Sequence, residues 1–471
     1  MSHYLAAMLS LQWFFLFYFL CVNSSYLMLN VLAYISMRRH LDTQITGVLP
    51  QAYAGFLPPV SLLVPAYNEA ATIAASVRSM LQLTYHEFEI IVINDGSTDE
   101  TLAELMREFD LIPFAEAYWR KLPTRPVRGI WRSTRYPNLR VVDKENGGKA
   151  DALNAGINAA RYPLFCAVDA DSILQRDSLQ LIAQPFIEDA RTIAAGGTVR
   201  VVNGCKVSGG FLGSVGLPRK ILPMLQIVEY LRAFLFGRLG WSSLNAMLVI
   251  SGAFGLFRKS SVIDVGGYRT DTVGEDMELV MRLHRLHRKR RIPYRIVYVP
   301  NPVCWTEVPE TLRMLNHQRA RWQRGLSESL MMNLGLLFSL RGGWAGWLAF
   351  PFALLFEWFG PIIELSGYIF MVIGLWLGVV HVPAFLAFTL VAIVLGILQS
   401  TSALLLEEMS FHLYPRPKQL VILFLLSIIE NFGYRQLTLF WRLSGLLRWL
   451  FGAKPEWGNM TRTASWQQHK T

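Results

Sequence analysis

The stretch that decides the fold reads Leu164-Phe165-Cys166-Ala167-Val168-Asp169-Ala170-Asp171-Ser172. Five apolar residues before a polar exit predict a buried strand that leaves the core at Asp169. Side chains two residues apart on an extended segment point the same way, so Asp169 and Asp171 can face one pocket. Their mutual repulsion is relieved by a divalent cation and hydrogen-bond donors, although such a pair can equally cap the next helix.

The composition predicts membrane helices joined to a soluble domain. The 471 residues are too many for one ordinary core, 52% of them are hydrophobic and only 17% are charged, and the mean hydropathy is +0.31. A net charge of +11 could indicate a nucleic-acid binder, but long apolar segments favour positive charge beside anionic lipid, and such charge also attracts a nucleotide diphosphate. The four cysteines show no CxxC spacing, which fits a reducing compartment without disulfides or zinc.

Residues 4–34 are apolar and uncharged, and Arg38, Arg39 and His40 follow closely. This segment is longer than the apolar part of a cleavable signal and lacks a basic start, so residues 1–40 are expected to hold an uncleaved transmembrane helix. The basic flank places the following domain, residues 41–340, in the cytoplasm.

Residues 341–450 become membrane-like again. Residues 383–406, 365–380 and 419–441 are candidate spans, and residues 344–359 are a short fourth crossing or a surface helix. Three crossings would put the tail, residues 451–471, outside and four would put it inside, which its basic residues favour. Three acids lie in or near these stretches and either line a polar path or sit at the interface: Glu357, Glu364 and Glu430.

Between the membrane segments, strand and helix patterns alternate. Strands are predicted at residues 60–65, 88–93, 139–142 and 164–168, which implies a mainly parallel sheet with ligands at the carboxyl ends of its strands. Residues 109–137 are interpreted as a basic loop-like insertion, residues 218–240 as an amphipathic helix near the membrane, and residues 279–295 as a basic surface that contacts headgroups rather than nucleic acid.

Polar motifs follow two further strands. Asp95 begins the sequence Asp-Gly-Ser-Thr-Asp, where its carboxylate can accept hydrogen bonds from a base or ribose, unless the segment is only a turn that caps a helix. In Asn146-Gly147-Gly148-Lys149, two flexible glycines and a cation could bring N–H groups and an ammonium to phosphate oxygens. This loop lacks the spacing of a P-loop.

Two motifs lie on predicted helices. Gly274-Glu275-Asp276 sets acids at a helix start, where they suit the helix dipole, and Asp276 is also a candidate general base that can take a proton from an acceptor hydroxyl. Further on, Gln318, Arg321 and Trp322 can share one helix face and offer an amide, a diphosphate-pairing guanidinium and a flat apolar ring.

Taken together, these motifs resemble the membrane-embedded family 2 glycosyltransferases, the processive group that includes cellulose, hyaluronan and poly-N-acetylglucosamine synthases. The family's D, DxD, D and QxxRW pattern is matched, in order, by the following residues: Asp95, Asp169-Ala170-Asp171, Asp276, and Gln318-Arg319-Ala320-Arg321-Trp322. The resemblance covers about residues 60–325 and the flanking spans. The family usually has Thr before the Glu-Asp pair, where this chain has Gly274.

The resemblance implies a GT-A domain, a Rossmann-like α/β fold, that uses a UDP-sugar and Mg²⁺ or Mn²⁺. It assigns the nucleotide to Asp95 and Asp169, the metal to Asp171 with Asp169, and catalysis to Asp276 with Glu275. It assigns further substrate contacts to Ser251, Gly252, Gln318, Arg321 and Trp322. Two more substrate-binding candidates are Glu69, in the exit loop of the first strand, and Lys149 of the glycine loop. Ser251 and Gly252 belong to a segment that looks like the family's acceptor-side loop.

One base and no covalent carboxylate predict inversion, which gives a β-linkage from an α-linked donor. The expected activity is extension of a polysaccharide at a bacterial inner membrane, coupled to its translocation, with the bilayer, the polysaccharide or glycolipid acceptor and accessory export subunits as partners and no nucleic acid. The alternatives are transfer of one sugar to a lipid carrier, and a transport or scaffold protein without catalysis.

Overall fold

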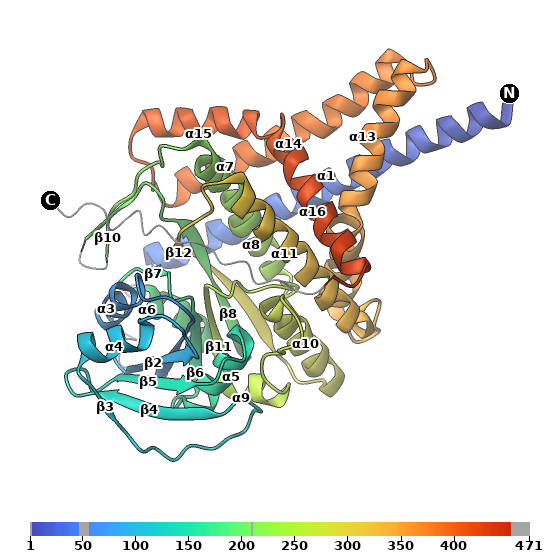
Figure 1. The fold of residues 1–471 in the computed structure, drawn as a ribbon. Helices are drawn as coiled ribbons and strands as arrows, with labels where there is room; N and C mark the ends of the chain where they lie inside the picture. Colours follow the sequence, from blue (N-terminus) through green and yellow to red (C-terminus); the bar gives the residue numbers. More distant parts are fainter. Residues whose placement is uncertain (1, 47–55, 209–210, 454–471) are drawn as a thin grey trace.

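The computed structural model describes residues 2–46, 56–208 and 211–453, and it combines an α/β domain with a set of long helices (Figure 1). Most of the predicted tail lies outside these residues. The ten strands of the main sheet are arranged in the order β3-β4-β5-β2-β1-β6-β11-β8-β12-β7. Their bounds are β1 Val60–Ala66, β2 Phe88–Asp95, β3 Leu111–Pro113, β4 Val127–Ser133, β5 Leu139–Lys144, β6 Leu164–Val168, β7 Ile173–Leu174, β8 Thr192–Val201, β11 Phe254–Arg258 and β12 Arg295–Thr306. A small second sheet pairs β9 (Lys206–Ser208) with β10 (Phe211–Ser214).

The centre of the sheet is the predicted parallel core. Strands β5, β2, β1 and β6 run parallel in that order, and each begins within a residue of the expected position. Their residues are almost all buried because helices cover the sheet, which is why they read as continuous apolar runs. Outside this core the sheet is mixed, since β11 pairs antiparallel with both β6 and β8.

The basic insertion is partly a sheet edge, which corrects the prediction of a loop over residues 109–137. Strand β4 pairs antiparallel with β5, and β3 pairs antiparallel with β4. The pattern was hidden because β4 is only half-buried and two arginines interrupt its apolar residues. Pairing satisfies its backbone hydrogen-bonding groups without requiring a continuous apolar face.

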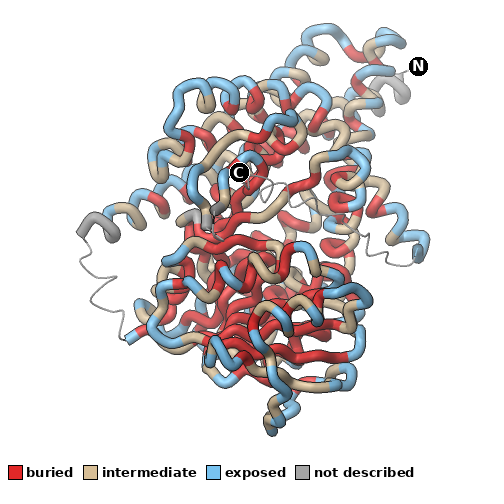
Figure 2. The backbone as a smooth tube through the Cα atoms, turned by 60° about the vertical axis from the view of Figure 1, so that its left-hand side comes forward, coloured by how far each residue is buried: buried red, intermediate tan, exposed pale blue. Residues whose placement is uncertain are grey.

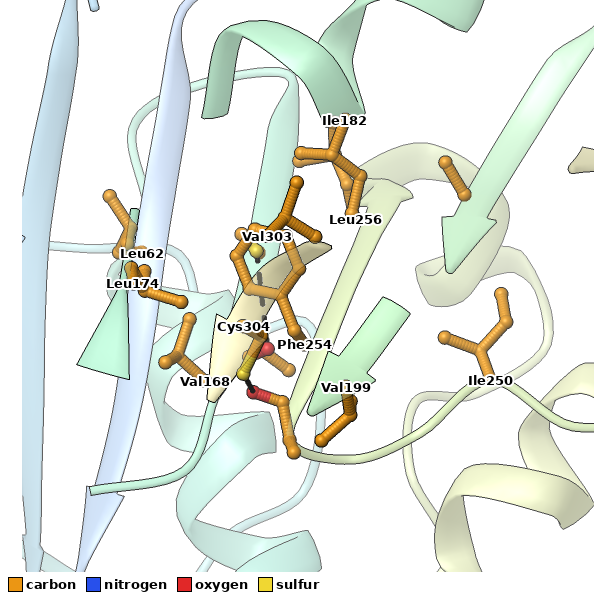
Figure 3. Packing of buried hydrophobic residues seen from close by; sticks show 14 of the residues in the cluster. Leu62, Val168, Leu174, Ile182, Val199, Ile250, Phe254, Leu256, Val303 and Cys304 are labelled. Carbon is orange, nitrogen blue, oxygen red and sulfur yellow. Dashed lines mark hydrogen bonds between the residues drawn. The ribbon is translucent and has the colours of Figure 1, made fainter. Parts of the chain in front are cut away.

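Helices cover the sheet and frame its carboxyl edge. Their bounds are α3 Ile73–Leu81, α4 Thr101–Phe109, α5 Lys149–Ala159, α6 Ser178–Glu188, α9 Lys259–Asp264, α10 Glu275–Arg290 and α11 Leu312–Met332. Helix α5 packs on β1 and β2, and α6 packs on β8 and β12. The buried residues concentrate in this α/β body (Figure 2). Figure 3 shows how side chains from several strands, among them Leu62, Val168, Phe254 and Cys304, fill the core behind the end of β6.

The remaining helices form the membrane-like part. They are α1 Ser2–Thr46, α7 Ile221–Tyr230, η2 Leu231–Gly237, α8 Arg238–Ser243, η3 Leu334–Leu336, η4 Ala345–Ala349, α12 Phe350–Phe352, η5 Ala353–Trp358, α13 Gly360–Trp376, α14 Val382–Ser410, α15 Pro417–Ile429 and α16 Tyr434–Leu450. Helices α1 and α14 are long and apolar enough to cross a membrane. The predicted interfacial segment over residues 218–240 is the helical run α7-η2-α8.

Two further spans are possible only as bent pairs. Residues Ala345–Trp358 and α13 are bent by 47°, and α15 and α16 by 58°, so up to four spans exist if each pair is one span. The candidate span over residues 419–441 therefore corresponds to one of these bent pairs and not to a straight helix. It breaks after Ile429, and Gly433 adopts a φ of 109° that a residue with a side chain rarely occupies.

Buried acids in this helical part have basic partners. Glu430 is fully buried and pairs with Arg232 of η2 at 2.5 Å and with Arg435 of α16 at 3.4 Å. Glu407 of α14 pairs with Arg200 of β8, which ties the α/β domain to the helices. Glu430 lies just after the end of α15, at the bend between α15 and α16.

Candidate active site

Asp95 is held at the carboxyl edge by a neighbouring strand and a glycine loop. It ends β2, stands in register with Lys144 at the end of β5, and forms a buried ion pair with it. Its carboxylate also accepts hydrogen bonds from Gly147 N at 3.0 Å and Gly148 N at 2.7 Å. These two amides were expected to face phosphate, and the structure corrects this, because they hold Asp95 instead.

The glycines are required where they occur in this loop. A Cβ on Gly147 would lie 2.6 Å from the carboxyl carbon of Asp151, and Gly148 has a φ of 87°. Asp151 in turn pairs with Lys144 at 2.7 Å. The loop therefore closes tightly over the Asp95–Lys144 pair and presents Lys149, the first residue of α5, to the edge of the sheet.

Lys149 brings three of the predicted site segments together. Its ammonium pairs with Asp169, at the end of β6, and a Cβ on Gly252 would lie 2.9 Å from its Nζ and 3.7 Å from Asp276 Oδ2. Gly252 N donates to Asp276 Oδ2 at 3.2 Å. The DxD segment, the loop containing Ser251 and Gly252, and the Glu-Asp pair thus converge on one ammonium group.

The charges around Lys149 shift two pKa values. Burial by itself would lower the pKa of Lys149, but the carboxylates of Asp169 and Glu275, with Asp276, outweigh it and raise the pKa. Burial raises the pKa of Glu275 to about 7; Lys149 opposes this shift and Asp276 adds to it. Glu275 is only 5% exposed, so it can hold a proton near neutral pH beside Asp276.

Asp276 is fixed in orientation by backbone donors. Besides Gly252 N, Met277 N donates to its Oδ1 at 2.8 Å. Asp276 stands in the first turn of α10, where exposed amides and the helix dipole favour a negative charge. The carboxylate is half-buried, so one side remains open to a substrate.

The departure from the family at Gly274 has a structural reason. A Cβ on Gly274 would lie 2.7 Å from Gly325 O, and a Cβ on Gly325 would lie 2.9 Å from Gly274 Cα. The start of α10 therefore touches the backbone of α11, which carries the Gln-Arg-Ala-Arg-Trp motif. Through this contact Arg321 lies close enough to Glu275 to favour its ionised form.

Arg319 was named within the motif without a role, and the structure gives it one. It is 3% exposed, donates to Glu229 of α7 at 2.7 Å, and its guanidinium carbon lies 4.2 Å from the centre of the Trp322 ring. Tyr434, the first residue of α16, donates to the same Glu229 oxygen at 2.7 Å. Only the contact between α7, α11 and α16, which is not local in sequence, reveals this role.

The other predicted residues lie as follows. Gln318 is 8% exposed, and within the described residues its buried Oε1 accepts no hydrogen bond. Trp322 is 39% exposed, as a platform for a ligand requires.

The remaining predicted residues lie in loops at the ends of strands. Glu69 accepts a hydrogen bond from Thr72 Oγ1 at 2.8 Å, and the side chains of Asp99 and Thr101 accept hydrogen bonds from the backbone of the same loop. Asp171 is half-buried just past β6, and the Ser251 hydroxyl contacts Ala253 N at 3.4 Å.

Across the described ranges, no group of three or more His, Cys, Asp or Glu side chains is placed to hold a metal ion. Mg²⁺ and Mn²⁺ sites that use substrate phosphates need only one or two carboxylates from the protein, and Asp169 and Asp171 supply two hard oxygen donors. The residues fit such a shared site.

The α/β fold with acids, an ammonium and a helix motif converging at the carboxyl edge defines a glycosyltransferase of the GT-A type. Residues 164–398 match the model described as glycosyl transferase family group 2, and residues 61–121 match glycosyl transferase family 2. The chain is a family 2 glycosyltransferase.

Curated relatives agree with this assignment. The chain is 35% identical to poly-β-1,6-N-acetyl-D-glucosamine synthase of Staphylococcus aureus strain COL over 278 residues. The matched region makes up 58% of this chain and 56% of that protein. It is 33% identical over 273 residues to the synthase of the same name from Staphylococcus epidermidis, covering 58% and 55%. The match thus spans just over half the length of these relatives.

Among solved structures, the chain is similar to a mannosyltransferase from Pyrobaculum calidifontis in complex with GDP-Man and Mn²⁺. The sequence identity is 17% and the TM-score is 0.48, over 90% of this chain and all of that one.

Proposed function

We propose that this protein transfers a sugar from a UDP-sugar onto a growing β-linked polysaccharide at a membrane, with inversion at the anomeric carbon. By similarity to the synthases of the two staphylococci, the sugar is N-acetylglucosamine and the product a β-1,6-linked polymer. Candidate spans α1 and α14 support a membrane location, and the bacterial inner membrane with a cytoplasmic catalytic domain is part of the proposal.

One observation carries the proposal, namely the convergence on Lys149. Asp169, Gly252 and Asp276 come from separate parts of the chain, yet they meet at one cation beside the Asp95 loop. A pocket with an ammonium and carboxylates at the ends of parallel strands suits a nucleotide diphosphate and its counter-ion. Acids that only cap separate helices are not expected to lie around the same ammonium group.

In the proposed reaction, each residue has a distinct task. Asp276 takes the proton from the acceptor hydroxyl, which then attacks the anomeric carbon while the bond to the diphosphate breaks. Arg321 and Lys149 stabilise the charge that builds on the departing diphosphate. Gln318 offers its buried carbonyl oxygen to a donor on the substrate, and Trp322 packs under the acceptor sugar.

A divalent cation would be held by Asp169 and Asp171 together with the diphosphate. When bound, it supplies positive charge to the leaving group. Lys149 pairs with Asp169, so its ammonium lies beside the carboxylate that would hold the cation and is near enough to contact a bound diphosphate. Direct displacement with a single base gives inversion, because no carboxylate is assigned to form a covalent intermediate.

The proposal is tested by supplying purified full-length protein with a panel of nucleotide sugars and measuring release of the nucleoside diphosphate, followed by sizing of the product. Turnover with UDP-N-acetylglucosamine and a ladder of long polymer is expected. If the product is instead a single sugar attached to a lipid, the activity is transfer to a lipid carrier and not extension of a polymer. No diphosphate release from any donor, with the protein folded, would contradict the enzyme activity itself.

A further inference from the structure

A basic cavity lies away from the catalytic edge, between the C-terminal half of α10 and the segment after α11. Its volume is about 620 Å³, and its lining includes Arg285, Arg288, Lys289 and Arg341. A second cavity of about 400 Å³ shares Arg288 and Arg341 with it. None of these four side chains has a task in the proposed transfer reaction.

The cavity has a large excess of positive charge. Five basic side chains line the larger cavity against one carboxylate, Asp264, which pairs with Arg290 at 3.5 Å. Arg282 is neutralised by Glu278 at 2.6 Å. In the described part of the chain, the other four basic side chains form no ion pair with a carboxylate, so the site attracts an anion from outside.

An exposed apolar loop stands next to this charge. Leu340 is 94% exposed, Phe338 54%, Trp344 58% and Trp347 48%. The loop is nevertheless ordered, since Phe338 N donates to Gly346 O at 3.1 Å and Trp347 Nε1 donates to Ser339 O at 2.9 Å. Phe338 adopts a φ of 49°, which a bulky residue rarely does, so the backbone holds these rings outward at a local cost.

The position of the loop connects it to the membrane. Its last residues, 345–347, begin the segment Ala345–Trp358, which together with α13 forms a bent pair that is long and apolar enough for one membrane span. Helix α10 packs against α11 and η3, the elements just before the loop (Figure 1). Tryptophan and phenylalanine beside arginine and lysine are the side chains that settle at the level of lipid headgroups.

We propose that this cavity binds the phosphate headgroup of an anionic phospholipid, with Phe338, Leu340, Trp344 and Trp347 inserted beside its acyl chains. A phosphodiester supplies the negative charge that the four cationic side chains lack. A free phosphate or nucleotide would account for the charge but not for the ordered apolar loop. The lipid explains both features at once and would fix the depth of the α/β domain against the bilayer.

The test measures binding of detergent-solubilised phosphatidylglycerol and phosphatidylcholine to the full-length protein by native mass spectrometry. Phosphatidylglycerol is expected to bind about tenfold or more tightly than phosphatidylcholine. The triple variant Arg285→Gln/Lys289→Gln/Arg341→Gln should lose this preference. The matched control Lys121→Gln/Arg125→Gln/Arg128→Gln removes the same charge from another exposed basic segment and should keep it.

Two further arms separate the sources of phosphate. Phe338→Ser/Leu340→Ser should weaken phosphatidylglycerol several-fold, while inorganic phosphate should not displace the lipid from the native protein. Displacement by inorganic phosphate at similar concentration, or equal loss of preference in the triple variant and its control, would overturn the proposal. Unchanged diphosphate release in detergent shows that each variant is folded.

Discussion

Two ion pairs, one in each half of the molecule, differ in how far their carboxylates are exposed to solvent. The Lys149–Asp169 pair at the sheet edge leaves 20% and 30% of its side chains exposed. The Arg232–Glu430 pair among the long helices leaves 21% of Arg232 exposed but none of Glu430, and Ser400 and Arg435 are further partners of Glu430. The carboxylate of the first pair is therefore open to a ligand, whereas the carboxylate of the second is closed off by its own helices.

This difference separates residues that can bind a substrate from residues that stabilise the fold. A pair that is partly open can exchange one partner for a substrate, because water and phosphate can replace the lost contact. A closed pair cannot, and removing one partner leaves an uncompensated charge inside. Substitutions at the sheet edge should therefore change catalysis with little effect on stability, and substitutions among the helices should do the reverse.

Removal of divalent metal should have the largest effect on the open region. With excess chelator we expect transfer to fall to background, because the departing diphosphate then lacks the positive charge of the cation proposed at Asp169 and Asp171. Diphosphate release is measured before and after adding back Mg²⁺ or Mn²⁺. Activity that survives chelation would remove the metal role from Asp171 and leave Lys149 as the cation.

The Asp276→Asn substitution should lower turnover by about 10²–10⁴-fold, because the amide cannot take the proton of the acceptor. Nucleotide binding should survive, since the amide keeps a hydrogen bond to Gly252 N. Single-turnover assays and nucleotide titration measure the two effects separately. Unchanged turnover would exclude Asp276 as the base. The exposed Asp271→Asn is a matched control from the same segment.

In the closed region, Glu430→Gln should cost about 3–5 kcal/mol of stability, because Arg232 and Arg435 lose the fully buried carboxylate that pairs with both. Denaturant unfolding in detergent measures this cost. The control Glu104→Gln breaks an exposed pair with Arg107 and should cost less than about 1 kcal/mol. Equal costs in the two variants would erase the distinction between open and closed pairs.

Arg319→Gln tests the point where the two regions meet. Loss of the cation–π contact should let Trp322 move and raise the KM for the acceptor about fivefold to tenfold, with a smaller effect on kcat. Tyr434→Phe keeps the Arg319–Glu229 pair and should leave this KM unchanged. A fall in kcat alone would mean that Arg319 does not position Trp322.

The smallest effect is a pH dependence of stability due to Glu275. Its pKa in the folded protein, about 7, lies above its ordinary value near 4.5, so folding favours the protonated form. The native protein should lose stability as the pH rises from about 4.5 to about 7 and then level off, and Glu275→Gln should remove this slope. Melting temperatures across the pH range measure it. A steeper slope in the variant would contradict the raised pKa.

Sequence reasoning found the parallel core because its signals are local. Each central strand is an apolar run that stops at a polar residue, as at Val168-Asp169 and Ile93-Asn94-Asp95, so both the strand and its exit could be predicted. The outer strands β3 and β4 were missed because an edge strand needs no continuous apolar face. The break at Gly433 was missed because the apolar pattern continues on both sides of it.

For the site, residue types could be predicted but their partners could not. Asp95 was identified as important, yet its use of Lys144, Gly147 and Gly148 depends on the register of β2 with β5. Gly274 looked like a departure from the family, and only its contact with Gly325 explains it. Each of these contacts joins segments about fifty residues apart, where no periodicity of the chain gives a signal.

The contact between Gly274 and Gly325 restricts how the protein can change. Neither position can gain even a methyl group unless the opposite backbone withdraws, since the atoms already approach within 3 Å of where it would stand. An evolutionary path toward the threonine of other family members would need both helices to be repositioned in the same lineage. The two glycines should therefore be inherited as a pair.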